Sequence, residues 1–99
     1  MSLQIVFHGI NRSAAVETVV QEKLDLLRRF DNQLGDCKVT VTQEGHQTVG
    51  AFTIKIDLVC CGKDLVVSRT NMDVNAAIAE AFDTIRRSVV DEVEKRRAH

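Results

Sequence analysis

The chain has 99 residues, of which 44% are hydrophobic and 27% are charged, and this length and balance predict a single small domain spanning residues 1–99. The formal net charge of −1 argues against a protein that coats nucleic acid by bulk charge. A chain with this net charge can still bind nucleic acid if its basic residues gather on one face. The sequence shows neither a long apolar run nor a signal peptide, so we expect a cytoplasmic protein without a membrane span.

The first third of the sequence predicts a strand followed by an amphipathic helix. Apolar residues alternate with the others from Leu3 to His8, which is the period of a strand, and Gly9 ends it. From Ser13 to Phe30 the apolar period becomes that of a helix with one buried face, and Ser13 is a suitable N-cap. The predicted buried arc of this helix comprises Val16, Val19, Val20, Leu24, Leu26, Leu27 and Phe30.

The rest of the sequence predicts three more strands and a closing helix. Alternation over residues 37–42, 52–61 and 65–70 predicts the strands, which a polar loop over 44–50 and a turn at 61–64 would connect. The helical period then begins after Asn71 or Asp73, either of which would cap the helix. Its predicted buried stripe comprises Val74, Ile78, Ala81, Phe82, Ile85 and Val89.

This order predicts an α+β fold, a two-layer β-α-β-β-β-α arrangement with a four-stranded mixed sheet and two helices packed on one face. Each long strand has one apolar and one polar side, as expected for a sheet that is covered on one face only. A helix connects the first two strands, so we expect them to be parallel with a right-handed crossover. The last three strands should form an antiparallel meander.

The cysteines predict neither a disulfide framework nor a metal site. Their number is odd, and Cys60 and Cys61 are adjacent in a predicted strand, where neighbouring side chains point to opposite faces. We therefore expect Cys37, Cys60 and Cys61 to be small apolar residues in a reducing compartment.

Motifs of catalysis are missing from the sequence. It contains no phosphate-binding glycine loop, no nucleophile elbow and no HExxH. His8 and His46 have no evident catalytic partner, and the carboxylates are scattered over helix exteriors. We predict a binding protein without catalytic residues, cofactor, metal or small-molecule substrate, and a small enzyme is the least favoured alternative.

The aromatic residues restrict how the chain would bind RNA. It has no Trp and no Tyr, and the four phenylalanines fall in the apolar phase of their elements, where we expect them in the core. Modules that bind single strands usually stack bases on exposed aromatic rings. RNA binding would therefore depend on phosphate contacts of Arg and Lys on the helices. The phenylalanines are Phe7, Phe30, Phe52 and Phe82.

The cations of the two helices allow two interpretations. Lys23 lies by angle inside the apolar arc, so either its ammonium reaches solvent at the rim or it lies in the groove between the helices. Arg87 has Asp83 and Asp91 four residues away, whereas Arg86 has no acid at that spacing. Charge patterning alone favours a solvated face, because basic residues near helix C-termini also complement the helix dipole. These terminal residues are Arg28, Arg29, Lys95, Arg96 and Arg97.

Two stretches of the sequence resemble a known family. GINRSAAVETVVQEKLDLLRRF is similar to its first helix, and SRTNMDVNAAIAEAFDTIRRSV is similar to the end of its fourth strand and its second helix. The D-x-x-A-A-I core over residues 73–78 is the most specific part. The family is that of the ribosome hibernation promoting factors, also called ribosomal subunit interface or sigma-54 modulation proteins. The chain looks like the short form, a single hibernation-factor-like domain without the C-terminal dimerisation domain of the long form.

The resemblance implies a non-enzymatic translation inhibitor that binds the small ribosomal subunit where mRNA and tRNA anticodons lie. Such proteins act in stationary phase or stress and promote ribosome hibernation. Basic residues on two parallel helices would contact rRNA phosphates, and Lys23 and Arg87 match basic positions of the family. The predicted RNA-binding set comprises Lys23, Arg28, Arg86, Arg87, Lys95 and Arg97.

The sequence also departs from the family. Leu26 and Asp91 stand where relatives often have lysine, and Glu92 and Glu94 add negative charge to a helix end that is usually strongly basic. Each lost phosphate contact lowers the salt-dependent part of the affinity.

The alternative is a diverged protein-interaction module of the same fold that does not bind ribosomes. This module would self-associate through the open sheet face. For the protein itself we expect a monomer or weak homodimer. The apolar residues in that phase are Val6, Val59 and Val66, of which the last two could be neighbours across a hairpin.

Overall fold

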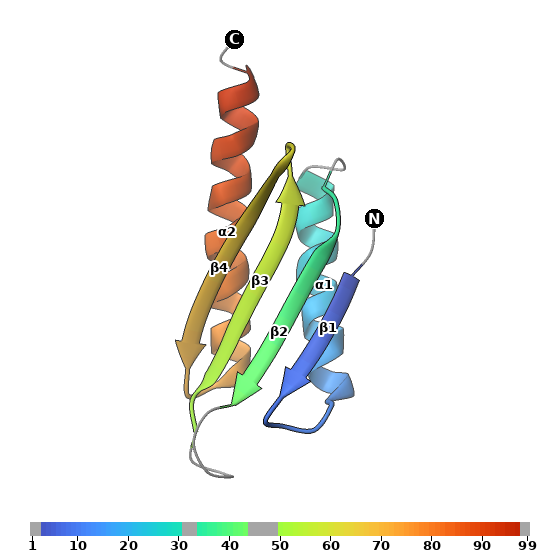
Figure 1. The fold of residues 1–99 in the computed structure, drawn as a ribbon, viewed down its shortest axis with the longest axis vertical. Helices are drawn as coiled ribbons and strands as arrows, with labels where there is room; N and C mark the ends of the chain where they lie inside the picture. The colour runs from blue at the N-terminus through green and yellow to red at the C-terminus, as the bar shows by residue number, and fades with distance from the viewer. Residues whose placement is uncertain (1–2, 31–33, 44–49, 98–99) are drawn as a thin grey trace.

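The computed structural model describes residues 3–30, 34–43 and 50–97, apart from the side chains of Phe30, Arg96 and Arg97. Its elements follow the predicted order, which confirms the α+β fold class (Figure 1). The predicted loop over 44–50, with His46, lies outside the described residues except for Gly50. The elements are β1 (Leu3–His8), α1 (Ala14–Phe30), β2 (Cys37–Gln43), β3 (Phe52–Cys60), β4 (Lys63–Asn71) and α2 (Val74–Arg97).

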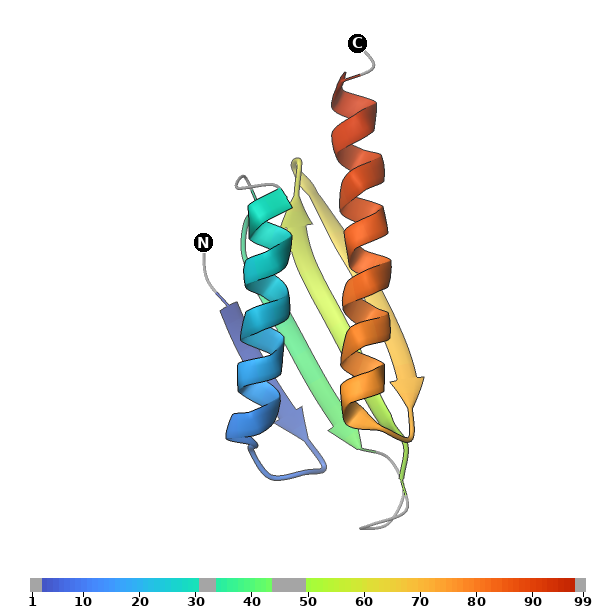
Figure 2. The same cartoon turned by 180° about the vertical axis from the view of Figure 1, so that it is seen from behind.

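The sheet is mixed and has four strands in the order β1-β2-β3-β4. β1 pairs with β2 in parallel, and β3 is antiparallel to both β2 and β4, as the connections predict. Both helices cover the same face of the sheet and run in the same direction (Figure 2). Among the helices described here, none has the length and apolar character needed to cross a membrane.

The core fills the space between the sheet and the helices. Inward-facing residues of β2 and β3 alternate strictly with exposed or half-buried ones, as a one-sided sheet requires. None of the described polar or charged residues is buried. The largest fully buried side chains are Leu24, Ile54, Ile56, Leu58, Ile78, Ile85, Val20, Val39, Val41, Val89 and Cys60.

The predicted buried faces of the helices are mostly correct. Leu26 is the exception in α1, because 55% of it is exposed. Phe82 is buried as predicted, whereas Phe7 and Phe52 are only half-buried. Val19 and Val74 are also half-buried, at the margins of their helix faces.

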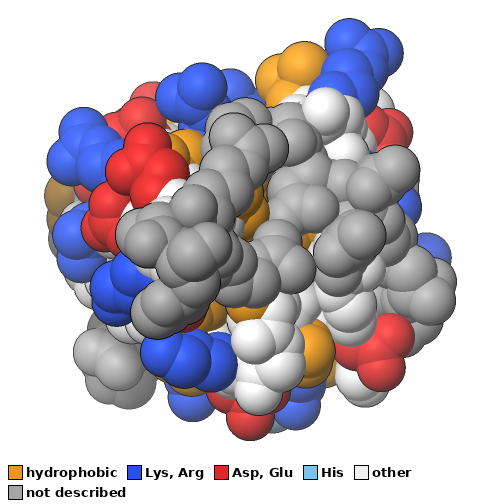
Figure 3. Space-filling view, turned by 90° about the horizontal axis from the view of Figure 1, so that it is seen from above, with side chains coloured by type: hydrophobic (Ala, Val, Ile, Leu, Met, Phe, Trp, Pro, Cys, Tyr) orange, Lys and Arg blue, Asp and Glu red, His pale blue; other side chains and the backbone are white. Residues whose placement is uncertain are grey.

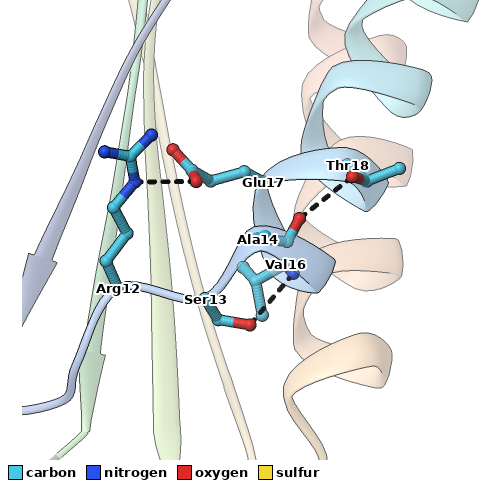
Figure 4. Close-up of polar contacts among 6 residues, drawn as sticks. All are labelled: Arg12, Ser13, Ala14, Val16, Glu17 and Thr18. Carbon is cyan, nitrogen blue, oxygen red and sulfur yellow. Dashed lines mark hydrogen bonds and ion pairs between the residues drawn. The ribbon is translucent and has the colours of Figure 1, made fainter.

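The start of α1 is fixed by hydrogen bonds of the residues that precede it (Figure 4). The backbone N–H of Val16 donates to Ser13 Oγ at 3.3 Å, and the N–H of Glu17 donates to the Ser13 carbonyl at 3.0 Å. Arg12 Nε lies 2.8 Å from Glu17 Oε1. Ser13 is therefore the N-cap, as predicted, because its side chain satisfies a donor that the first helical turn leaves unpaired.

Both predicted candidates contribute to the start of α2. The N–H of Asn75 donates to Asp73 Oδ1 at 2.9 Å, and the N–H of Ala77 donates to the Asp73 carbonyl at 3.0 Å. Asn71 acts one step earlier, since its Oδ1 accepts from the N–H of Asp73 at 2.9 Å. Asp73 is thus the cap, and its charge also suits the positive end of the helix dipole.

The open sheet face is mainly polar. The hydroxyl groups of Thr53 and Thr70 lie 2.9 Å apart across β3 and β4. Val59 and Val66 are 39% and 56% exposed, but the register places each opposite a carboxylate rather than opposite the other valine. The opposing pairs are Val59 with Asp64 and Val66 with Asp57.

A two-residue turn joins β3 to β4. Cys60 pairs with Lys63, and the intervening Cys61 and Gly62 have φ angles of 59° and 77°. Positive φ at both central residues is the pattern of a type I′ hairpin turn, for which Asn-Gly is a favoured sequence. The prediction that Cys60 and Cys61 point to opposite faces is wrong, because Cys61 is no longer extended and the two Sγ atoms lie 3.1 Å apart.

We expect Cys61→Asn to stabilise the protein by ~1 kcal/mol, because asparagine tolerates a left-handed backbone better than most residues. Urea denaturation would measure the difference. Gly62→Ala is the control, since a Cβ at Gly62 meets nothing within 4 Å and would destabilise through its positive φ by about 1 kcal/mol. An unchanged midpoint for both variants would contradict this turn conformation.

Candidate nucleic-acid interface

A groove of about 390 Å³ lies between α1 and α2. The two helices run side by side on the sheet (Figure 2). Residues from distant parts of the sequence therefore line the groove from its two sides. Lys23 and Arg86 both line this groove, one from each helix. Lys23 is half-buried there, whereas Arg86 is exposed. The full lining is Lys23, Leu26, Leu27, Ala79, Phe82, Asp83 and Arg86.

The cations at the groove differ in their pairing. Among the described residues, neither Lys23 nor Arg86 forms an ion pair or a side-chain hydrogen bond. Arg87 Nη2 lies 2.8 Å from Asp83 Oδ2, the pairing that their spacing predicts. Asp83 also lines the groove. The groove region therefore contains two cations, Lys23 and Arg86, without an ion-pair partner in the described part of the chain, and one cation, Arg87, that is paired with a carboxylate.

Two residues of the predicted RNA-binding set lie elsewhere. Arg28 does not line the groove, and its Nη1 is 3.8 Å from Asp25 Oδ1. Lys95 Nζ lies 3.4 Å from Glu92 Oε1, on the side of α2 that meets β4. The side chain of Arg97 is outside the described residues. The structure thus brings together Lys23 and Arg86, with Arg87 adjacent, but not Arg28 or Lys95.

Positive and negative side chains are mixed over one end of the molecule. Figure 3 looks along the long axis from above and shows Lys and Arg side chains beside Asp and Glu. This end therefore does not present one uniform positive surface.

Glu92 connects α2 to the sheet. Its carboxylate lies 3.3 Å from Lys63 Nζ at the start of β4, and its side chain is 14% exposed. The hydrogen bond from Lys63, together with the charges of Lys63 and Lys95, lowers the pKa of Glu92 below its usual value. This contact links α2 to the start of β4. The C-terminal end of α2 extends beyond the sheet (Figure 1).

The chemistry of the groove suits a phosphate. An ammonium acts as a compact point charge, and a guanidinium can donate two parallel hydrogen bonds to phosphate oxygens. Among the described residues that line the groove, the only aromatic one is Phe82, which is 5% exposed and so offers little surface for base stacking. The described residues contain no cluster of three potential metal ligands. Contacts to a nucleic-acid backbone fit this arrangement better than base recognition.

Residues 3–97 match the family described as sigma 54 modulation protein / S30EA ribosomal protein. The chain belongs to this family. Its members are ribosome-associated and non-enzymatic, so the predicted family and the predicted non-enzymatic class are confirmed. No curated protein matches the sequence significantly.

Solved structures agree with this family assignment at the level of the fold. A ribosomal subunit interface protein from Coxiella burnetii is 11% identical with a TM-score of 0.79, and the match covers 100% of both chains. The Thermus thermophilus Protein Y N-terminal domain is 23% identical with a TM-score of 0.76, and the match covers 90% of this chain and 96% of that one. At these identities the likeness shows a shared fold alone.

Sequence reasoning missed the apolar part of the groove. The helical period predicts Leu26 in the core, yet Leu26 lines the groove and is 55% exposed. Ala79 has a small side chain on the facing helix and leaves room beside it. Helical angles place a residue on a face but do not show where the second helix lies, so the groove lining could not be read from either helix alone.

We expect Glu92→Gln to reduce stability at neutral pH, because a carboxylate with a lowered pKa stabilises the fold only while it is ionised. The extra stability of the wild type is fully present above the ordinary glutamate pKa of about 4.3. It is lost as the pH falls through the lower pKa that Glu92 has in the folded protein. Denaturant midpoints of both proteins between neutral and strongly acidic pH would measure this.

Glu94→Gln is the matched control for Glu92→Gln. Glu94 lies on the same helix, is exposed and has no ion pair with a described residue. Its removal should leave the midpoint unchanged. Equal effects of the two variants would contradict a specific contribution of the Lys63–Glu92 contact.

Proposed function

We propose that this protein binds the small ribosomal subunit through rRNA phosphates, inhibits translation in stationary phase or stress, and promotes ribosome hibernation. Binding in the channel used by mRNA and tRNA anticodons would inhibit by occlusion and needs no chemical step. Membership of a ribosome-associated family supports the partner. The arrangement of cations between the helices supports the mode of binding.

One observation carries this proposal. Lys23 and Arg86 project from separate helices into one groove and have no acidic partner among the described residues. A cation that is already paired must lose that pair before it binds a phosphate, whereas Lys23 and Arg86 need not. Their two charges therefore contribute to phosphate binding without a competing internal contact.

The small number of groove cations proposed to bind phosphate, Lys23 and Arg86, predicts a modest dependence of binding on salt. Each neutralised phosphate contributes roughly 0.7–0.9 to the slope of log affinity against log salt. Two contacts from Lys23 and Arg86 would thus give a slope of roughly −1.4 to −1.8. Leu26 occupies the groove where relatives often have lysine, so part of the usual electrostatic contribution is missing.

The interaction-module alternative receives less support from the open face. Val59 and Val66 are exposed, but each is opposed by a carboxylate in the register. Their carboxylate neighbours are Asp64 and Asp57, which a second copy of this face would have to desolvate. The two valines are diagonal neighbours across β3 and β4 with a carboxylate opposite each, so the face does not offer a continuous apolar patch there.

The double variant Lys23→Gln/Arg86→Gln should weaken co-sedimentation with purified small subunits by at least about tenfold, because a charged hydrogen bond contributes roughly 1.5 kcal/mol or more. The slope of log affinity against log salt concentration should also become less negative by roughly 1.4–1.8. Binding is measured at several salt concentrations with folded protein, as judged by circular dichroism.

The double variant Lys38→Gln/Lys55→Gln is the charge-matched control. Both lysines are exposed on the open sheet face, away from the helices. This control should bind like the wild type. Equal losses in the two double variants would point to bulk charge rather than to the groove, and no binding of folded wild type at low salt would reject the ribosome proposal.

Asp83→Asn should strengthen binding about two- to fivefold. It releases Arg87, and it removes a negative charge beside the phosphate that costs ~0.5–1 kcal/mol of binding free energy. The same co-sedimentation assay at fixed salt measures it. Asp64→Asn on the open face makes the same change in net charge and should have no effect. A weaker complex for Asp83→Asn would mean that Asp83 positions Arg87 for binding instead of competing for it.

A further inference from the structure

The β3–β4 turn brings two thiols into contact. Cys60 ends β3 and is 1% exposed, whereas Cys61 begins the turn and is half-buried. Their Sγ atoms lie 3.1 Å apart. The contact depends on the positive φ of Cys61, because an extended backbone would direct the two side chains to opposite faces.

The turn uses a residue that is unfavourable for its conformation. A left-handed backbone costs roughly 1–2 kcal/mol for a residue other than glycine. Asparagine would fit the first position of this turn better, yet cysteine stands there. Backbone strain of this kind is characteristic of sites where the side chain has a function. The strained position carries the more accessible of the two thiols.

We propose that Cys60 and Cys61 form a reversible oxidation site, at which a hydroperoxide converts the two thiols to a vicinal disulfide. Cys61 is the attacking residue because it is the more accessible, and Cys60 is the resolving residue because its sulfur is already in contact.

The reaction is balanced in two steps. The Cys61 sulfur attacks one peroxide oxygen and the O–O bond breaks, so Cys61 becomes a sulfenic acid and the other oxygen leaves as water or an alcohol with the thiol proton. The Cys60 sulfur then attacks the Cys61 sulfur, the S–O bond breaks, and water leaves with the Cys60 proton. The peroxide is reduced by two electrons, and the thiol pair is oxidised by two electrons.

The product would be easy to reduce. Consecutive Cα atoms are about 3.8 Å apart across a trans peptide, below the roughly 4.4–6.8 Å usual for disulfides. A disulfide between adjacent residues is therefore strained, and strained disulfides have the more oxidising potentials that are found in regulatory sites. A cellular thiol such as glutathione can restore the dithiol, so the site is compatible with a reducing compartment.

Cys37 is a poor partner for either thiol. It pairs with Leu58, so Cys60 is two residues further along the neighbouring strand. Such diagonal neighbours lie about 7–8 Å apart, too far for a disulfide without backbone movement. Burial also raises the pKa of the Cys37 thiol to about 11, which keeps it protonated and unreactive at neutral pH.

Peptide mapping of the folded, peroxide-treated protein tests the proposal directly. Trypsin places Cys60 and Cys61 together in Ile56–Lys63 and Cys37 alone in Phe30–Lys38. After hydrogen peroxide and alkylation with N-ethylmaleimide in denaturant, we expect Ile56–Lys63 to be two hydrogens lighter and unalkylated. Phe30–Lys38 should carry the alkyl group. Treatment with glutathione should return Ile56–Lys63 to the doubly alkylated form.

Other products would overturn the proposal. A cross-link between Ile56–Lys63 and Phe30–Lys38, a disulfide between two chains, or sulfinic acid on Cys61 without loss of two hydrogens would each contradict it. Two variants assign the roles. Cys60→Ser should leave Cys61 as a sulfenic acid that dimedone labels, and Cys61→Ser should leave Cys60 alkylatable after the same exposure. Peptide mapping of the wild type decides the question even where a variant folds poorly.

Discussion

The burial of one sheet face beneath two parallel helices is the constraint on which the rest of this structure depends. The inward-facing residues of β2 and β3 can leave water only if both helices lie on that face. The parallel pairing of β1 with β2 places α1 there, and the antiparallel meander returns the chain so that α2 lies beside it. The groove that brings Lys23 close to Arg86 is a consequence of this packing.

Electrostatics then depend on local pairing rather than on net charge. Of the six helix cations whose side chains are described, three form an ion pair with an acid on the same helix: Arg28 with Asp25, Arg87 with Asp83 and Lys95 with Glu92. Such exposed pairs contribute little to stability, but they reduce the field that a distant phosphate experiences. Lys23 and Arg86 lack such a partner among the described residues. A chain with a net charge of −1 thus retains a locally positive site.

The sequence predicts the fold better than it predicts the site. Alternation and helical period encode which side of an element is buried, and this was enough to obtain the strand order, the Ser13 cap and most of the core. The prediction for Leu26 is wrong because the apolar period of α1 does not show where its apolar face meets α2. For the same reason Lys95 was grouped with Arg86, although it lies on the side of α2 that meets β4. Family membership confirms the fold and the ribosome-associated class, while the residue-level site remains a proposal.

The cysteines show a different limit of sequence patterns. Alternation predicts opposite directions for the Cys60 and Cys61 side chains only where the backbone is extended. Cys61 begins a two-residue turn, and its backbone is not extended. The same turn leads directly into Lys63, whose ammonium contacts Glu92 on α2. A change in the backbone of the turn would therefore act on the contact that links β4 to α2. Since the turn lies away from the Lys23–Arg86 groove lining, thiol chemistry there and phosphate binding between the helices use separate residues, and each can be altered by substitution without removing the other.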